Sequence, residues 1–424
     1  MSWQTVPLRQ LITPNNKRNR PDLPLLSVVR DKGIIKRKLD KSDNHNIIPE
    51  DLSNYKVVSE GQFVINKMKA WQGSCGVSQY EGIVSPAYYV FDLNIGNPRF
   101  FNYAIRSRIF VDEFGRISSG IRVDQWDLSL QKLKYVPFLL PPREEQDQIV
   151  RYLDWKVSQI NKLINAKRRQ IALLVEQKRA VINEALTQNG DGWNVARLKH
   201  LCHNIGDIDH KMPEAQGDGI PYISPRDFYS DNAINFNNAK KISQKSFEEL
   251  SKKIRPEKGD LIFSRYATLG ATRLVDTDID FLVSYSCVTI KPNQLKINTE
   301  YLYFYFISSL IENEIRNYSY ETTQSNIGVD SIKKFRISYP SDITTQQTIV
   351  DFVKSKTSTI SKTLDAMYKE ITLFAEYRTR LISDVVTGKL DVRGVSVPEY
   401  DVVGEIVGDE TIDDSELTEV EELQ

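Results

Sequence analysis

Basic, amide and aromatic side chains gather in the polar stretches of this 424-residue chain. Arg and Lys contact phosphates and guanine, whereas Asn and Gln can form paired hydrogen bonds with adenine. Any one of these residues alone is more simply a solvated surface group, so the prediction depends on the set. We predict a nucleic-acid contact surface that contains Asn15, Asn16, Lys17, Arg18, Arg20, Lys36, Arg37, Lys38, Lys67, Lys69, Trp71, Arg226, Lys240, Lys241, Arg265, Tyr266, Gln324 and Asn326.

Other chemistry is weakly supported. Three of the four histidines lie near a cysteine, at His200, Cys202, His203 and His210, but their spacing matches no standard zinc-ligand pattern. The sequence contains no Asn-Pro-Pro-aromatic motif for methyl transfer to a base, and no Gly-x-x-x-x-Gly-Lys-Ser/Thr phosphate loop. We therefore predict no metal, no catalytic residue and no cofactor on this chain.

The formal net charge of +0 averages two unlike regions. The last 31 residues, 394–424, hold eleven acidic residues and no basic one, which leaves 56 basic and 45 acidic residues before them. A basic body is compatible with a polyanionic partner. Three distant cysteines and the lack of a signal-like or membrane-spanning apolar run favour a soluble, cytoplasmic protein.

Two segments of the chain repeat each other at a distance of 200 residues. Identical residues recur at thirteen places between 146–187 and 346–387, including Gln146 and Gln346. Stepping by three and four from Val150 to Ala185, and again from Val350 to Val385, nine of eleven positions are apolar in each case. This heptad pattern predicts two coiled-coil helices of about 36 residues.

A similar frame precedes each helix. A turn glycine leads into a short strand that ends at a basic residue in 61–67 and in 259–265, and an apolar strand-like run precedes prolines near 141 and 340. We predict an α+β fold with mixed α/β modules at 1–142 and 193–340. Helical spacers follow at 143–192 and 341–392, and an acidic disordered tail occupies 393–424.

The two helices most economically pair with each other. An internal duplication favours an antiparallel pair with a pseudo-two-fold axis, because the contact is then self-complementary and the modules lie at opposite ends of a rod. Self-assembly with a second chain is the alternative.

The residues at 141–149, 66–71 and 82–88, together with the heptad helices, carry a family resemblance. The chain resembles the specificity subunits of type I restriction-modification systems from Trp3 to about Asp391. The resemblance implies that the modules are target-recognition domains, each reading one half of a split DNA site, with the helices fixing the gap.

The resemblance also implies partners for this chain. These are double-stranded DNA, two methyltransferase subunits that carry S-adenosylmethionine, and motor-nuclease restriction subunits. The competing functions are a coiled-coil adaptor that joins two proteins without touching DNA, and a self-sufficient modifying enzyme, for which the sequence holds no motif.

Overall fold

The computed structural model describes residues 3–30, 32–37, 51–120, 126–187, 192–210, 213–229, 232–266, 268–319 and 326–404. The chain divides into two compact units. Unit 1 combines Met1–Ala166 with Ile371–Gln424, and unit 2 is Lys167–Glu370. Each unit therefore joins one module to part of each long helix.

Unit 1 is built around a four-stranded antiparallel sheet with the order β2-β9-β6-β7. Short hairpins and paired strands surround it, and β1 pairs with β12 where the module enters and leaves. The elements are β1 (Gln4–Pro7), β2 (Ile12–Asn15), β3 (Leu26–Val29), β4 (Gly33–Lys36), β5 (Lys56–Val58), β6 (Phe63–Asn66), β7 (Cys75–Val77), β8 (Gly82–Val84), β9 (Tyr88–Leu93), α1 (Pro98–Ile105), α2 (Arg108–Ile117), β10 (Ser118–Ser119), β11 (Asp127–Leu128), α3 (Leu130–Leu133), β12 (Pro137–Leu140) and α4 (Arg143–Thr187).

Unit 2 has a sheet of the same kind, with the order β14-β22-β19-β20 and antiparallel pairing throughout. A three-stranded sheet, β18-β15-β21, lies in the place of the smaller hairpins of unit 1, and one of its pairs is parallel. The elements are β13 (Trp193–Arg197), β14 (Cys202–Gly206), β15 (Ile220–Ile223), β16 (Phe228–Tyr229), β17 (Ala233–Ile234), β18 (Lys240–Ile242), α5 (Gln244–Leu250), β19 (Leu261–Ser264), β20 (Thr272–Leu274), β21 (Leu282–Val283), β22 (Cys287–Pro292), α6 (Thr299–Ile307), α7 (Leu310–Tyr318), α8 (Val329–Ile332), β23 (Arg336–Pro340) and α9 (Ile343–Val386).

The landmarks that the sequence repeats have the same place in both units. Gly61 and Gly259 adopt positive φ angles of 83° and 90°, which glycine tolerates without a steric cost, and each turns the chain toward a central strand of its sheet. Aromatic and aliphatic residues of that strand, of β9 or β22, and of the following helices then form the core. The mixed α+β architecture with two long helices is therefore as predicted.

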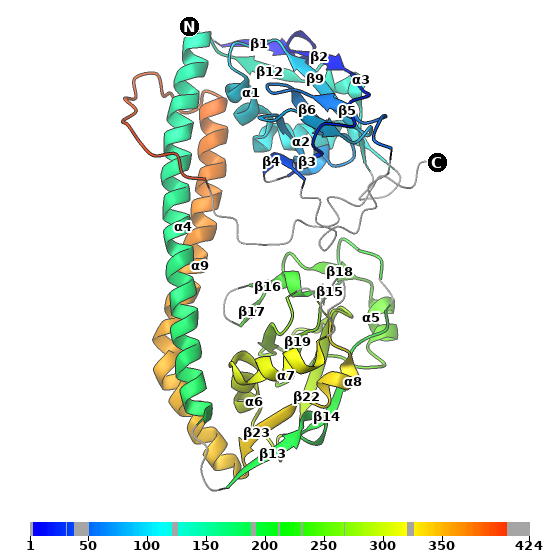
Figure 1. Ribbon diagram of the computed structural model, residues 1–424, viewed down its shortest axis with the longest axis vertical. Coiled ribbons are helices and arrows are strands. Elements are labelled where there is room, and N and C mark those ends of the chain that lie inside the picture. The colour runs from blue at the N-terminus through cyan, green and yellow to red at the C-terminus, as the bar shows by residue number, and fades with distance from the viewer. Residues whose placement is uncertain are drawn as a thin grey trace. The chain divides into compact units, whose positions relative to one another are not determined.

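In unit 2, α4 and α9 lie side by side and run in opposite directions (Figure 1). Lys167 forms an ion pair with Glu370, and Lys178 Nζ donates to Ser361 Oγ at 3.0 Å. Residue numbers therefore increase along α4 where they decrease along α9, as in an antiparallel pair. Both lysines are polar interruptions of the heptad pattern. Their contacts with the partner helix explain how the apolar seam tolerates them.

In unit 1 the same two helices meet through apolar positions and a polar pair. Ile160, Ile164 and Val385 are at most 5% exposed, and Arg378 Nη1 donates to Asn161 Oδ1 at 2.7 Å. The helices contain 45 and 44 residues, more than the predicted 36, because each begins seven residues before the first position of the predicted seam. None of the helices in the described ranges combines the length and apolar content of a membrane span.

The chain after α9 corrects one expectation. We expected a disordered tail from residue 393, but Val392–Gly404, here called the C-terminal strap, lies against α4 in unit 1. Ser158, Asn161 and Asn165 donate to strap carbonyls at 2.7–3.0 Å, and Val392, Val395 and Val397 join the core. Charge counting missed this because the contacts use the strap's backbone and its valines. Residues 405–424 lie outside the described residues.

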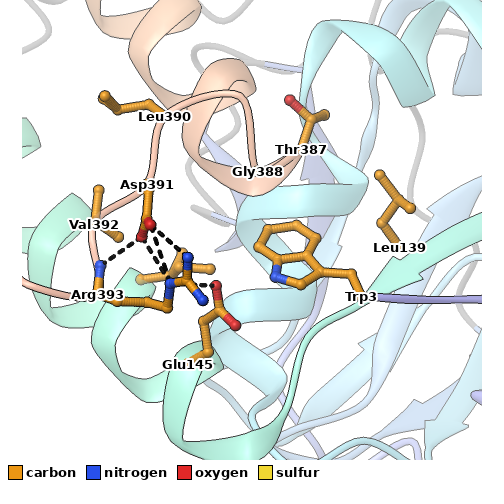
Figure 2. Close-up of a pocket in the computed structure, with 10 residues that line it drawn as sticks. Trp3, Leu139, Glu145, Thr387, Gly388, Leu390, Asp391, Val392 and Arg393 are labelled. Atoms are coloured by element: carbon orange, nitrogen blue, oxygen red, sulfur yellow. Dashed lines mark hydrogen bonds and ion pairs between the residues drawn. The ribbon is translucent and has the colours of Figure 1, made fainter. Parts of the chain in front are cut away.

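The start of the strap also closes a cavity of about 340 Å³ in unit 1 (Figure 2). Trp3 lies on one side of it, 3.4 Å from a Cβ placed on Gly388, and Arg393 lies on the other with Glu145 at 3.9 Å. The cavity is formed where Trp3 and residues 387–393 meet the first turn of α4. It is therefore part of the helix attachment and not of the module loops.

Candidate nucleic-acid interface

In both modules, the residue that directly follows the central strand is basic. Lys67 follows β6, its carbonyl accepts from Leu128 N at 2.8 Å, and its Nζ lies 3.1 Å from an Asp127 carboxylate oxygen. Arg265 follows β19, and its carbonyl accepts from Ile327 N at 3.2 Å. Each module therefore has a basic residue at the end of its central strand, hydrogen-bonded to a loop from later in the chain.

In unit 1 this point forms a group of three cations. Lys56, on β5, is 6% exposed and donates through Nζ to the carbonyl of Tyr88 at 2.5 Å. Burial lowers the pKa of Lys56, and the positive charges of Arg18 and Lys67 lower it further. A positive field of this kind would be relieved by a phosphate.

The predicted residues after β2 lie on a loop beside β5. Lys17 O accepts from Val57 N at 2.8 Å, which fixes the loop, and the side chains of Asn16, Lys17, Arg18 and Arg20 are exposed. Arg20 is held by Asp22 at 2.7 Å, an exposed pair that stabilises little and can open. Four predicted residues are thus together on one accessible loop.

Two other predicted residues of unit 1 are buried, which differs from the prediction. Asn15 is 8% exposed and donates to Asp92 at 3.1 Å, and Lys69 is 6% exposed. Asn15 is the last residue of β2, and Lys69 lies in the turn after β6. We assign them structural roles.

The remaining predicted residues of unit 1 lie on neighbouring loops. Lys36 Nζ is 5.1 Å from the ring centre of Tyr80, and Arg37 follows it, partly buried. Trp71 packs 5.4 Å from Trp126 and donates to Met68 O at 3.1 Å, so its indole is engaged. Lys38 lies outside the described residues.

In unit 2, Arg265 holds three loops together and is only 5% exposed. Its guanidinium donates to Tyr285 O at 3.0 Å, to Ile327 O at 3.3 Å and to Asp207 at 3.0 Å. Each guanidinium nitrogen of Arg265 thus has a partner within the module, which gives this side chain a structural role. Contact of Arg265 with DNA stays a prediction. Tyr266 and Asn326, both predicted, meet beside it as a backbone bridge.

An aromatic group lies over this buried arginine. The His210 ring stacks on Tyr285 with centroids 4.8 Å apart, and His210 Nε2 is 3.2 Å from an Arg265 nitrogen. The side chain of His210 is 60% exposed, so the ring edge is available. Arg226, Lys240 and Lys241 lie elsewhere on this module, exposed or partly exposed, and Gln324 lies outside the described residues.

The second module and the first part of α9 are similar to a known protein family. Residues 190–371 match the family model for the type I restriction modification DNA specificity domain. This stretch is a type I restriction-modification DNA specificity domain. Over these residues, the resemblance drawn from the sequence is confirmed.

Two relatives extend the comparison. The type I restriction enzyme MjaIX specificity subunit of Methanocaldococcus jannaschii is 24% identical over 152 residues, which cover 35% of this chain and 34% of that protein. The match thus spans about a third of the relative's length. A chain from a solved structure on complex assembly and conformational transition of the type I R-M system aligns with a TM-score of 0.50 at 16% identity. It covers 92% of this chain and 98% of that chain, a likeness of fold.

Within the specificity domain, the His and Cys residues noted in the sequence do not gather. No three His, Cys, Asp or Glu side chains of the described ranges come together as a metal site. Cys202 is largely buried, and this burial raises the pKa of its thiol to about 12, so the sulfur is protonated at neutral pH. His210 instead belongs to the aromatic group of the specificity domain.

Sequence reasoning missed two residues that the geometry singles out. Lys56 begins a short strand that is otherwise apolar. A lysine at such a position indicates that its aliphatic side chain is buried and that its ammonium group has a specific acceptor. His210 carried a signal only as part of the rejected metal cluster. Its position over Arg265 in the specificity domain depends on loops far apart in sequence, so no local pattern could have shown it.

Proposed function

We propose that this chain is the non-catalytic DNA sequence-specificity subunit of a type I restriction-modification complex. The observation that carries the proposal is the DNA specificity domain at 190–371, joined to a unit 1 of the same sheet order. Each module reads one half of an asymmetric, bipartite duplex site. The sheets are alike and the loops differ, so two unlike half-sites are expected.

Phosphate and base contacts would come from different residues. In unit 1, Lys17, Arg18 and Lys67 supply positive charge beside the backbone, and Asn16 has the amide chemistry for a base edge. In unit 2, Arg226, Lys240 and Lys241 supply charge. The stacked His210 and Tyr285 offer a polar ring edge above a fixed arginine.

The helices would set the gap between half-sites. A helix of 45 residues is about 68 Å long at 1.5 Å per residue. That length exceeds the ~34–36 Å between two readers on the same face of B-DNA. A paired helix resists bending, so it would allow one gap length where a flexible linker would allow many.

Catalysis would belong to partner subunits. Two methyltransferase subunits that dock along the helices would bind S-adenosylmethionine. Motor-nuclease subunits would cleave the DNA, and the whole complex would act in the cytoplasm. This chain then contributes recognition and assembly.

Selection from random duplexes tests the function. The purified chain with its methyltransferase partner should enrich one bipartite sequence with a fixed gap, and the affinity should fall steeply as salt rises. A protein adaptor without DNA contact would enrich no sequence and would bind its partners equally well at low and high salt. Recovery of random sequences from this selection would contradict the proposal.

A further inference from the structure

Each module is fastened to a long helix by the same polar clasp. In unit 1, Gln146 is 3% exposed; its Oε1 accepts from Asn97 N at 3.0 Å and its Nε2 donates to Pro141 O at 2.8 Å. The Asn97 side chain donates to Asp147 at 2.6 Å and also caps α1. The clasp therefore joins the start of α4 to the start of α1.

Unit 2 repeats this pattern of contacts. Gln346 is fully buried; its Oε1 accepts from Asn298 N at 2.7 Å and its Nε2 donates to Pro340 O at 2.8 Å. The Asn298 side chain donates to Gln347 at 2.7 Å and caps α6. By these contacts alone, either module could attach to either helix.

Eight residues after Gln146 and Gln346, a second contact between helix and module is reversed in charge. In unit 1, Arg99 donates to Asp154 at 2.8 Å. In unit 2, the equivalent positions carry Glu300 and Lys354, with Lys354 Nζ donating to Glu300 at 2.7 Å. The carboxylate is on the helix in unit 1 and on the module in unit 2.

A hydrogen bond to Asp154 also distinguishes the two modules. Tyr103 OH donates to Asp154 at 2.9 Å, and Asp154 is only 12% exposed. The position equivalent to Tyr103 in unit 2 is Phe304, which has no hydroxyl, and its helix carries no acceptor at Lys354. The Asp154 site therefore recognises two features of the first module that the second lacks.

We propose that the charges at Asp154 and Lys354 select which module docks on which helix. With the helices exchanged, Arg99 would face Lys354 and Glu300 would face Asp154. Each exchange replaces an attraction by a repulsion, which is how a specific interface rejects a similar partner. Within one chain, two residues join β12 to α4 and two join β23 to α9, so the selection acts between copies. It disfavours docking of a module on the other helix of a second copy of this chain.

Charge-swap variants of the full chain test the pair itself. R99E and D154K should each lower the thermal midpoint of unit 1 by about 2–4 °C, the effect of roughly one surface ion pair on a unit of this size. R99E/D154K, which builds the unit 2 pair in unit 1, should recover at least half of the summed loss. R99Q should cost less than R99E, and K162E on an exposed position of α4 is the matched control.

A chimera tests the selection. Replacing residues 193–340 by a second copy of residues 3–140 brings a second Arg99 against Lys354. There K354D should raise the thermal midpoint of unit 2, whereas in the native chain K354D should lower it. Strict additivity in the R99E/D154K cycle would overturn the proposal, as would the same sign for K354D in both chains. Neither readout involves DNA, so the outcome is independent of the proposed function.

Discussion

Lys67 and Arg265 occupy the same position of the two modules, yet their side chains have different tasks. Lys67 is partly exposed beside Arg18 and Lys56, whereas Arg265 is buried and bound by loops on three sides. The frame fixes a cation at the end of the central strand. The loops around it decide whether that cation faces solvent or the protein.

Lys67→Ala tests the exposed member. It should weaken binding of all duplexes alike and lower the slope of log K against log salt by about 0.9, the share of one phosphate contact. Filter or fluorescence titrations at several salt concentrations measure both quantities. Lys162→Ala on α4 is the control, and an altered sequence preference without a change in slope would contradict the phosphate role.

Arg265→Met tests the buried member. It removes the link between three loops and one of the two cations that pair with Asp207, while Lys253 remains, so we expect a loss of about 2 kcal/mol from unit 2. Urea unfolding followed by hydrogen exchange across β19 measures this loss. Lys252→Met, at an exposed position of the same unit, should change stability by less than ~0.5 kcal/mol. An equal effect of both variants would argue against the structural assignment.

At the scale of elements, the repeated landmarks were readable because they are local. The turn glycines, the apolar strands and the heptad seam each depend on a few adjacent residues, and the predicted strands and helices are found there. The strap was missed because its valines are sparse and its bonds come from α4, 240 residues away in sequence.

The predicted contact residues differ in exposure for a related reason. Sequence shows that a residue is basic or polar, but exposure depends on which strand face it occupies and which loop returns to it. The loop of Asn16 to Arg20 is exposed as expected. Asn15, one residue earlier, is in a strand and is bonded to Asp92, which a distant part of the chain supplies.

The start of α9 gives a prediction in pH. Asp342 precedes the helix and accepts hydrogen bonds from the side chain of Thr344 and from Thr345 N at 3.0 Å. These bonds lower the pKa of Asp342 to about 2, from an ordinary 3.8. Because the folded pKa lies below the unfolded one, the stabilisation is present above about pH 4 and is lost as the pH falls toward 2.

Asp342→Ala should therefore lower the thermal midpoint of unit 2 at pH 6 but have little effect near pH 2. Scanning calorimetry across this range measures the difference, and Asp365→Ala at an exposed position of the same helix is the control. An NMR titration of the Asp342 carboxyl with a midpoint near 4 would contradict the cap.

At the scale of the whole molecule, residues far apart in sequence, near the N-terminus and just after α9, meet in unit 1. Trp3 packs beside Gly388, and the strap continues from there along α4. Truncation separates the strap from the acidic segment after it. A chain ending at Asp391 loses three valine contacts, about 2 kcal/mol, and its unit 1 should melt about 4–8 °C lower.

A chain ending at Gly404 is the matched control for that truncation. It keeps every contact described for the strap, so its thermal midpoint should stay within about 1 °C of the full chain. If both truncated chains melt alike, the strap does not stabilise unit 1.

Burial of the native thiols has a practical consequence. Cys75 and Cys287 are fully buried, Cys202 is largely so, and burial raises the pKa of all three. Maleimide reagents attack thiolates, so the natural chain should stay unlabelled at neutral pH. Cysteines introduced at Ile109 and Leu295, which are 44% and 89% exposed, would each take a single spin label. Pulsed electron paramagnetic resonance would then measure the distance between the two spin labels, and so between the units, as duplex DNA is added.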